Sequence, residues 1–181
     1  LAIFVSGSGT NMENLIRKIQ AGFVPVQASL VISDNPDAPA IDKAKRLGVE
    51  AAVVDRKKFS SKETFEAEIC RQLDEKKIDW IALAGFMRIL SARFVERYLG
   101  RLINIHPSLL PAFPGAHGIR EAFEAKVKET GVTVHFVIPA VDAGPIILQK
   151  KIAVLPSDTL ETLEARVHAV EYEIYPEALK L

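Results

Sequence analysis

Trp80–Ala84 reads WIALA, an almost wholly apolar run of strand length that is followed at once by Gly85. A run of this kind, without alternating polar residues, is typical of a central strand that is covered on both faces. Similar runs at Leu1–Ser6, Val26–Ser33 and Ala51–Val54 are each followed by a segment of helical period. This alternation predicts an α/β fold, a Rossmann-like open, mostly parallel twisted sheet with helices on both faces.

The segments between these runs have the period of amphipathic helices. Their apolar side chains recur in steps of three and four, which places them on one face of each helix. The clearest faces are Met12, Leu15, Ile16 and Ile19; Ile41, Ala44 and Leu47; Phe65, Ile69 and Leu73; and Leu160, Leu163, Val167, Val170 and Ile174. Asp158 and Glu161 have the spacing of a capping box at the start of the last helix.

The second half of the chain is less regular. Its spacing predicts a short helix over Phe94–Tyr98 and a strand over Leu102–Ile105, and the prolines of residues 107–114 exclude regular structure as far as Gly115. Val132–Ile138 alternates between two faces, and Pro145–Val154 follows closely enough to pair with it. We therefore expect an antiparallel strand near the C-terminal end of the sheet.

The composition of the 181 residues, 49% hydrophobic and 25% charged, suits one compact domain. Lys+Arg and Asp+Glu both number 23, so the net charge argues for neither a nucleic acid nor a membrane surface as partner. The single cysteine, Cys70, excludes an intrachain disulfide and fits a reducing compartment. Because no signal peptide precedes the first strand and no apolar run reaches the ~20 residues of a membrane span, we expect a cytoplasmic protein.

The loop Ser6–Asn11 (SGSGTN) lies between the first predicted strand and the first helix. Its glycines allow the backbone to approach a ligand closely, and free N–H groups at a helix start bind phosphate. Met12 stands where a dinucleotide-binding loop needs its third glycine, and no P-loop lysine follows. A mononucleotide or a sugar phosphate fits this loop best, and a tight turn without a ligand is the alternative.

Asn104 and His106 lie on the same side of their predicted strand, since side chains alternate along it. A carboxamide beside an imidazole can stabilise an oxyanion and donate a proton. Asp142, in a turn further along the chain, can pair with His106 and keep its imidazole protonated. Taken singly, each of these residues is at least as well explained by a structural role.

Ala84–Leu90 (AGFMRIL) leaves the central strand and could line a slot for a flat heteroaromatic ring. Alternatively this segment packs into the core, with Arg88 as a structural ion-pair partner.

His135 either supports the site or is a satisfied core histidine. All the candidate stretches follow predicted strands, at the edge where open α/β sheets bind ligands. No pair of histidines has zinc-ligand spacing, so we predict no metal.

Ser6–Asn11, Ala84–Ser91, Asn104–Pro111 and Thr133–Pro145 together resemble the folate-dependent formyltransferases, in particular the phosphoribosylglycinamide formyltransferase (glycinamide ribonucleotide transformylase) family of purine biosynthesis. The resemblance covers essentially the whole chain. The Asn-x-His-Pro-Ser-Leu-Leu-Pro stretch is common to folate formyltransferases, and the Ser-Gly-x-Gly-(Ser/Thr)-Asn loop indicates the ribonucleotide enzymes. The resemblance implies a single formyltransferase domain over residues 1–181, with phosphate binding in the N-terminal half and folate binding and catalysis in the C-terminal half.

The resemblance also implies the roles of individual residues. Formyl transfer from 10-formyltetrahydrofolate to glycinamide ribonucleotide would use a catalytic set of Asn104, His106 and Asp142. The substrate phosphate would bind Gly9, Thr10 and Asn11, with His168 nearby and Glu171 at the glycinamide end. The folate would contact Asn104, Met87, Arg88, Ile89, Leu90, Ile138, Pro139, Ala140, Val141 and Asp142, and its glutamate tail would approach Lys62. The family usually has Arg at the position of Lys62, has Gln or another residue at that of His168, and continues past Leu181.

Three other functions compete with this interpretation. Formyltetrahydrofolate hydrolase normally carries an extra N-terminal domain, and methionyl-tRNA formyltransferase an extra C-terminal RNA-binding domain; both differ in the first loop. A non-catalytic nucleotide-binding module would be expected to lack Asn104, His106 or Asp142, and all three are present. We expect small-molecule substrates only, and a monomer or weak homodimer.

Overall fold

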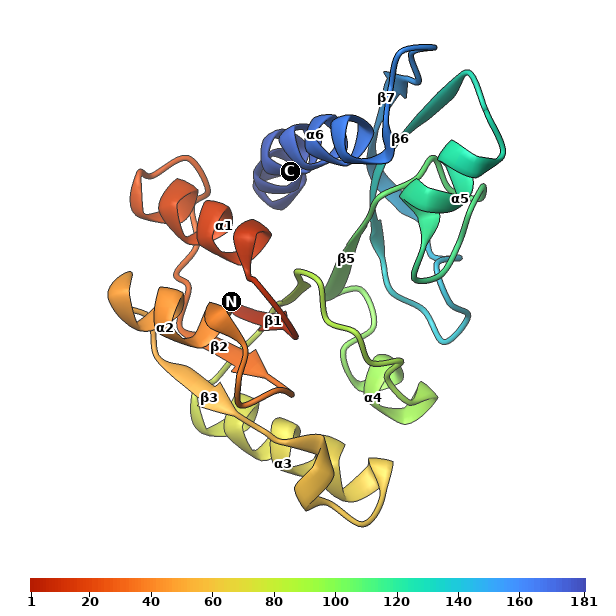
Figure 1. Cartoon of the computed structure of the whole chain (residues 1–181). Coiled ribbons are helices and arrows are strands. Elements are labelled where there is room, and N and C mark those ends of the chain that lie inside the picture. Colours follow the sequence, from red (N-terminus) through yellow and green to blue (C-terminus); the bar gives the residue numbers. More distant parts are fainter.

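The computed structural model describes all 181 residues, and its centre is a seven-stranded sheet with helices on both sides (Figure 1). The strands are β1 (Ala2–Val5), β2 (Leu30–Ser33), β3 (Ala51–Val53), β4 (Ile81–Leu83), β5 (Leu102–His106), β6 (Glu129–Phe136) and β7 (Ile146–Ala153), in the spatial order β3-β2-β1-β4-β5-β6-β7. The first five are parallel, and β6 pairs antiparallel with both β5 and β7. The predicted fold class is confirmed.

Two separate cores hold the helices against the sheet. The helices are α1 (Thr10–Gln20), α2 (Pro39–Arg46), α3 (Lys62–Glu75), α4 (Ala92–Arg97), α5 (Gly118–Glu124) and α6 (Leu160–Lys180), with a 3-10 turn η1 at Arg56–Lys58. One core joins α1, α2, α5 and α6 to one face, and the other joins α3 and α4 to the opposite face (Figure 1). Alternation along β1 divides its side chains accordingly, since Ile3 belongs to the first core and Phe4 to the second. No helix combines the length and apolar composition of a membrane span.

Several predicted boundaries differ from the structure. β2 begins at Leu30 rather than Val26, because the chain turns there and Val26 bonds back to Val24. The strand predicted at Val132–Ile138 begins three residues earlier, at Glu129, and ends at Phe136. α5 was not predicted at all.

The capping box of α6 was also misassigned. Thr159 and Thr162 form it, rather than Asp158 and Glu161, because a hydroxyl at the N-cap reaches the N3 backbone N–H. Asp158 instead accepts hydrogen bonds from the Leu155 backbone and the Thr162 hydroxyl.

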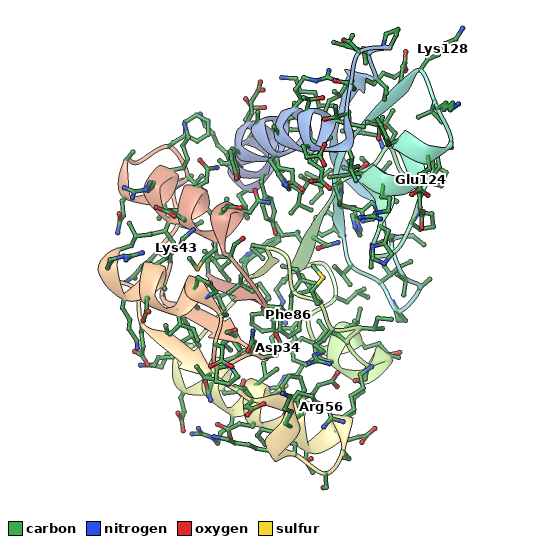
Figure 2. The ribbon with its side chains drawn as sticks, in the orientation of Figure 1. Asp34, Lys43, Arg56, Phe86, Glu124 and Lys128 are labelled. Carbon is green, nitrogen blue, oxygen red and sulfur yellow. The ribbon has the colours of Figure 1, made fainter.

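The order of the strands reverses between β1 and β4, and this places two loops side by side at the carboxyl edge. The Ser6 backbone N–H donates to Gly85 at 3.0 Å, and its hydroxyl accepts from the Met87 N–H at 2.8 Å and donates to Asp34 at 2.6 Å. Asp34 and Phe86 are labelled in this region in Figure 2. The loops after β1 and β4 are thus fixed to each other.

The loop between β6 and β7 returns across the sheet edge through a position that only glycine can occupy. A β-bulge between Val134 and His135 distorts the ladder just before it. The Phe136 N–H then bonds to the Pro145 carbonyl, which closes the loop. A Cβ on Gly144 would lie 1.7 Å from the Phe136 carbonyl oxygen.

Gly144→Ala should therefore destabilise the protein strongly, by about 3 kcal/mol, because the closed base of the loop must open to admit a methyl group. Denaturant unfolding measures this. Gly7→Ala is the control, since no heavy atom lies within 4 Å of the position that its methyl group would take; it should cost about 0.5 kcal/mol or less. Equal stability of the two variants would contradict the claim that only glycine fits at position 144.

Candidate active site

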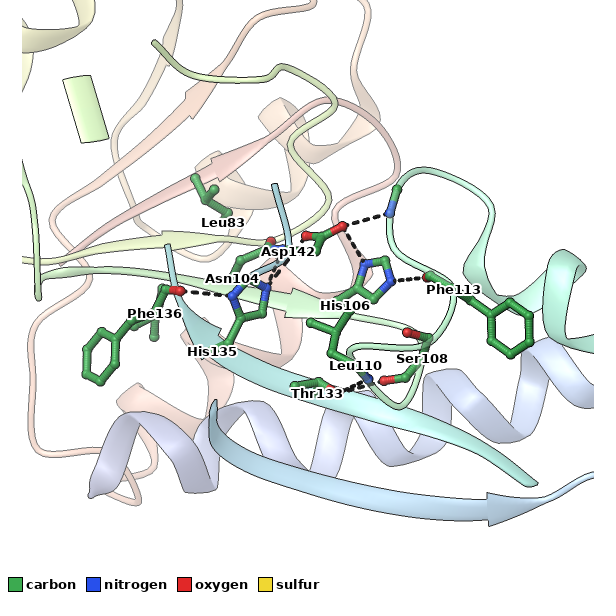
Figure 3. Close-up of polar contacts among 12 residues, drawn as sticks. Leu83, Asn104, His106, Ser108, Leu110, Phe113, Thr133, His135, Phe136 and Asp142 are labelled. Atoms are coloured by element: carbon green, nitrogen blue, oxygen red, sulfur yellow. Dashed lines mark hydrogen bonds and ion pairs between the residues drawn. The ribbon is translucent and has the colours of Figure 1, made fainter. Parts of the chain in front are cut away.

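The end of β5 presents Asn104 and His106 on one side, as predicted from alternation. Ile103 and Ile105 point into the core under α6, so the two polar side chains point to the other face. Asn104 pairs in register with His135 on β6. Figure 3 shows these side chains converging with Asp142.

His106 is buried, with 5% of its side chain exposed. Its Nε2 lies 2.8 Å from the Phe113 carbonyl oxygen. Because a carbonyl only accepts, Nε2 carries a proton and donates it there. The other ring nitrogen, Nδ1, faces Asp142 with an N–O distance of 3.6 Å (Figure 3). The predicted pairing of His106 with Asp142 is thus present as a close approach.

His135 is the residue that sequence reasoning left undecided, and it lies within the site. Its Nδ1 is 2.9 Å from the Phe136 carbonyl and so donates, while Nε2 is 3.3 Å from the Asn104 side-chain nitrogen. Burial lowers the pKa of His135, against opposing effects of the Phe136 hydrogen bond and Asp142. A neutral ring with its lone pair on Nε2 accepts from the Asn104 amide and orients it. The sequence alone could not assign this role, because the contact with Asn104 depends on the register of β6 against β5.

Asp142 lies between the two histidines. Its oxygens are 3.6 Å from His106 Nδ1 and 3.7 Å from His135 Nε2, and one also accepts from the Gly115 N–H at 2.8 Å. The residue has φ 51°, a left-handed conformation that is uncommon for a side chain other than glycine. Such backbone strain is found where the surroundings hold a functional group in place.

The proline-rich loop after His106 is also fixed to β6. Thr133 on β6 donates from its hydroxyl to the Ser108 carbonyl at 2.7 Å and accepts from the Leu110 N–H at 3.1 Å. Ser108 in turn donates to the Ala112 carbonyl at 2.6 Å. These bonds position the Phe113 carbonyl that holds His106.

The loop Ser6–Asn11 ends at the N-terminus of α1, where Gly9 is the N-cap with φ 69°. A Cβ on Gly9 would also lie 2.5 Å from the Cβ of Ala40, so only glycine lets α1 and α2 approach this closely. Thr10 is exposed. The first N–H groups of an α-helix have no intrahelical partner, so the start of α1 offers donors for an anion.

Asn11, Glu171 and His168, predicted separately to bind substrate, form one hydrogen-bonded group. One Glu171 oxygen accepts from Asn11 at 2.9 Å and from His168 at 2.8 Å, and only 4% of Glu171 is exposed. The Oδ1 atom of Asn11 is buried without a partner. Tyr175, one turn further along α6, donates to the Leu83 carbonyl and anchors the helix above β4.

The residues predicted to contact folate form exposed walls beside this edge. Met87 and Ile89 are 69% and 68% exposed and Val141 is 52% exposed, which is unusual for large apolar side chains. Leu90 is buried, Pro139 and Ala140 are exposed, and Ile138 is half-buried. Arg88 bonds to Asp34 at 2.6 Å, so the structural role considered for it is real.

Lys62 lines a pocket of ≈ 120 Å³ together with Arg88, Ile89 and Leu90. It therefore lies beside the segment that was predicted to contact folate. A larger pocket of ≈ 460 Å³ lies between α3 and α4, lined by Cys70 and Arg93 among others. None of the predicted site residues lines that larger pocket, so we place the site by the converging polar groups.

Residues 1–179 match the family model described as formyl transferase. Together with the fold and the carboxyl-edge site, this shows that the chain belongs to the formyl transferase family.

Within that family the similarity is to the phosphoribosylglycinamide formyltransferases. The chain is 41% identical over 179 residues to the protein of that name from Bacillus subtilis, covering 99% of this chain and 92% of that one. The structure of phosphoribosylglycinamide formyltransferase from Bacillus halodurans superposes with a TM-score of 0.96 at 46% identity, covering 99% of this chain and 92% of that one.

A longer relative contains a similar segment. The trifunctional purine biosynthetic protein adenosine-3 of Drosophila melanogaster is 43% identical over 183 residues, which cover 100% of this chain but only 14% of the fly protein. The chain thus spans a small part of that relative.

The lowered pKa of His135 predicts a pH-dependent contribution to stability. The unfolded chain takes up a proton near the ordinary value of 6.5, whereas the buried ring resists it. The free energy of unfolding should therefore fall as the pH drops through 6.5, and His135→Gln should lack this component. Denaturant unfolding of the wild type and of His135→Gln between pH 5 and 8 measures this component. The free energy by which the wild type is more stable than His135→Gln should shrink as the pH falls. Parallel pH profiles would contradict the neutral, buried imidazole.

Proposed function

We propose that this protein transfers the formyl group of 10-formyltetrahydrofolate to the amino group of glycinamide ribonucleotide, a step of purine biosynthesis. The observation that carries the proposal is the convergence of Asn104, His106 and Asp142 at the carboxyl edge, next to a separate anion-binding helix start. The names of the full-length relatives support the same reaction.

The reaction needs a group that stabilises negative charge on the formyl oxygen when the amine attacks the carbon. Asn104 supplies an amide N–H for this purpose, because one of its two N–H groups is directed to His135 and the other remains available. The His135 contact fixes the amide before the substrate arrives, so no reorganisation is needed as the charge develops.

The reaction also moves protons, since the attacking amine loses one and the departing folate nitrogen gains one. His106 is the proton donor in our proposal, acting from the Nδ1 side, which faces Asp142 rather than the carbonyl that holds Nε2. Asp142 accepts the proton that the amine releases, directly or through water.

The two substrates occupy different sides of this centre. The nucleotide phosphate lies at Gly9, Thr10 and Asn11, and Glu171 and His168 complete that subsite from α6. The folate ring lies between Met87–Leu90 and Ile138–Asp142, with its glutamate towards Lys62. The N-terminal half thus supplies the phosphate loop and the C-terminal half the catalytic groups.

Hydrolysis of formyltetrahydrofolate is the nearest alternative, because the same oxyanion and proton donors can serve water as nucleophile. The two reactions differ in their need for the nucleotide. Tetrahydrofolate release from 10-formyltetrahydrofolate should require glycinamide ribonucleotide. Release at the same rate without it would establish the hydrolase instead.

Asn104→Ala and Asp142→Asn should each lower kcat by about 100- to 1000-fold, the usual effect of losing one preorganised group. Their Kd for glycinamide ribonucleotide, measured by calorimetry, should stay within about threefold of the wild type, because the nucleotide subsite is built from other residues. Arg166→Ala, which changes a side chain on the far side of α6 bonded to Asp158 and Ala153, is the control for both measurements. Near-normal turnover in either site variant would refute the catalytic assignment.

A further inference from the structure

Gln149 lies in the same transverse row of the sheet as His106. His106 on β5 is directly opposite Thr133 on β6, and Thr133 is directly opposite Gln149 on β7. Side chains that are directly opposite each other on adjacent strands project from the same face. The row therefore joins the edge strand β7 to the candidate active site through Thr133.

The carboxamide nitrogen of Gln149 makes two hydrogen bonds at the base of the proline-rich loop. It lies 2.8 Å from the Thr133 hydroxyl oxygen and 3.0 Å from the Leu110 carbonyl oxygen. Because a carbonyl only accepts, the nitrogen of the carboxamide faces Leu110 and its oxygen points away. Gln149 is an exposed residue of β7, yet both of its N–H groups are directed inward.

The Thr133 hydroxyl uses its full hydrogen-bonding capacity in this arrangement. Its O–H donates to the Ser108 carbonyl at 2.7 Å, and its oxygen accepts from the Leu110 N–H at 3.1 Å and from Gln149. Thr133 and Ser108 are both 0% exposed. A side chain of the same shape as Gln149 but without donors would leave the Thr133 oxygen and the Leu110 carbonyl short of a partner, which is costly for buried groups.

The loop transmits this constraint to His106. Leu110 is held at its N–H by Thr133 and at its carbonyl by Gln149. Three residues later, the Phe113 carbonyl accepts from His106 Nε2 at 2.8 Å (Figure 3). A loop that is released at Leu110 can carry the Phe113 carbonyl away from the imidazole, and the ring then loses the contact that sets its orientation.

We propose that Gln149 is a positioning residue for the transfer reaction: it fastens Leu110 to Thr133 and so holds the loop whose Phe113 carbonyl orients His106. This inference rests on the proposed function. Gln149 lies outside both proposed substrate subsites and acts through the loop. Its loss therefore slows the step in which His106 moves a proton and leaves the binding of either substrate almost unchanged.

The first test compares three substitutions of Gln149 in steady-state transfer from 10-formyltetrahydrofolate to glycinamide ribonucleotide. Gln149→Glu keeps the shape of the side chain without its donors, Gln149→Met keeps its length without polar atoms, and Gln149→Lys supplies a donor long enough to reach the Leu110 carbonyl. In the Glu and Met variants kcat should fall about tenfold, because a small displacement of a catalytic group has an effect of this order, whereas Gln149→Lys should stay within about threefold of the wild type. The KM of both substrates should change by about twofold or less in all three variants, as expected when substrate binding is intact.

Lys151→Met is the matched control. Lys151 lies on the same face of β7, two residues further on, and bonds to Glu129 outside the loop. This variant should have the kcat of the wild type. If Gln149 only packs against its neighbours, Gln149→Glu will be the variant nearest to the wild type and Gln149→Lys no better than Gln149→Met. That order, or a loss that appears in KM rather than in kcat, would overturn the inference.

A second measurement follows the orientation of His106 without turnover. In protein labelled with ¹⁵N-histidine, the Nε2–H of His106 should give a slowly exchanging NMR signal, because the Phe113 carbonyl holds it. The Nδ1–H of His135, which is bonded to the Phe136 carbonyl, is the internal reference. Gln149→Glu should speed the exchange of the His106 signal and leave that of His135 unchanged.

The outcomes separate this inference from the proposed function. If Gln149→Glu leaves the exchange of the His106 proton at the wild-type rate, the positioning role is wrong while the proposed function stands. If the wild type transfers no formyl group to glycinamide ribonucleotide, the proposed function itself fails.

Discussion

The Asp142 carboxylate lies between two buried imidazoles, and the geometry of the candidate site depends on keeping it there. The carboxylate comes from a loop, whereas His106 and His135 come from adjacent strands of the sheet. The two strands fix the positions of the imidazoles, and Asp142 reaches the space between them with a left-handed backbone at φ 51°. The bulge in β6 and the tight return at Gly144 are the structural means by which the loop reaches it.

A second constraint is the reversal of strand order beside β1. It brings the glycine-containing loop after β1 and the segment after β4 together at the carboxyl edge, and Ser6 bonds to both Asp34 and the segment that contains Met87. Arg88, which in isolation looks like a ligand-binding cation, is held by Asp34 in the same network. The side chains of Met87 and Ile89 are exposed on either side of Arg88, and the backbone N–H of Met87 is bonded to Ser6. The hydrogen bonds of Ser6 and Asp34 thus fix a segment whose apolar side chains are exposed.

The sequence alone predicted the sheet, the antiparallel end and the carboxyl-edge site, because the periods of apolar residues are set by strand and helix geometry. It failed where long-range contacts decide. The start of β2 is set by a turn in which Val26 bonds back to Val24, and the end of β6 is set by the loop that Phe136 closes with Pro145. The helix α5 has too few apolar residues to show a period. His135 remained ambiguous because its role comes from pairing with Asn104, a fact of register rather than of local pattern. The position of the candidate residues at the carboxyl edge was readable from the sequence, but the hydrogen bonds among them were not.

The shared Glu171 oxygen has a consequence for how the molecule comes into being. It joins Asn11 to α6 across 160 positions of the chain, so this hydrogen bond is among the most non-local contacts of the fold. Contacts of such sequence separation form late, since a long loop must close before they gain anything. A nascent chain on the ribosome can complete β1 and α1 early, yet Asn11 cannot form this contact until α6 has emerged. The start of the first helix is therefore joined to the last helix only when synthesis is nearly finished.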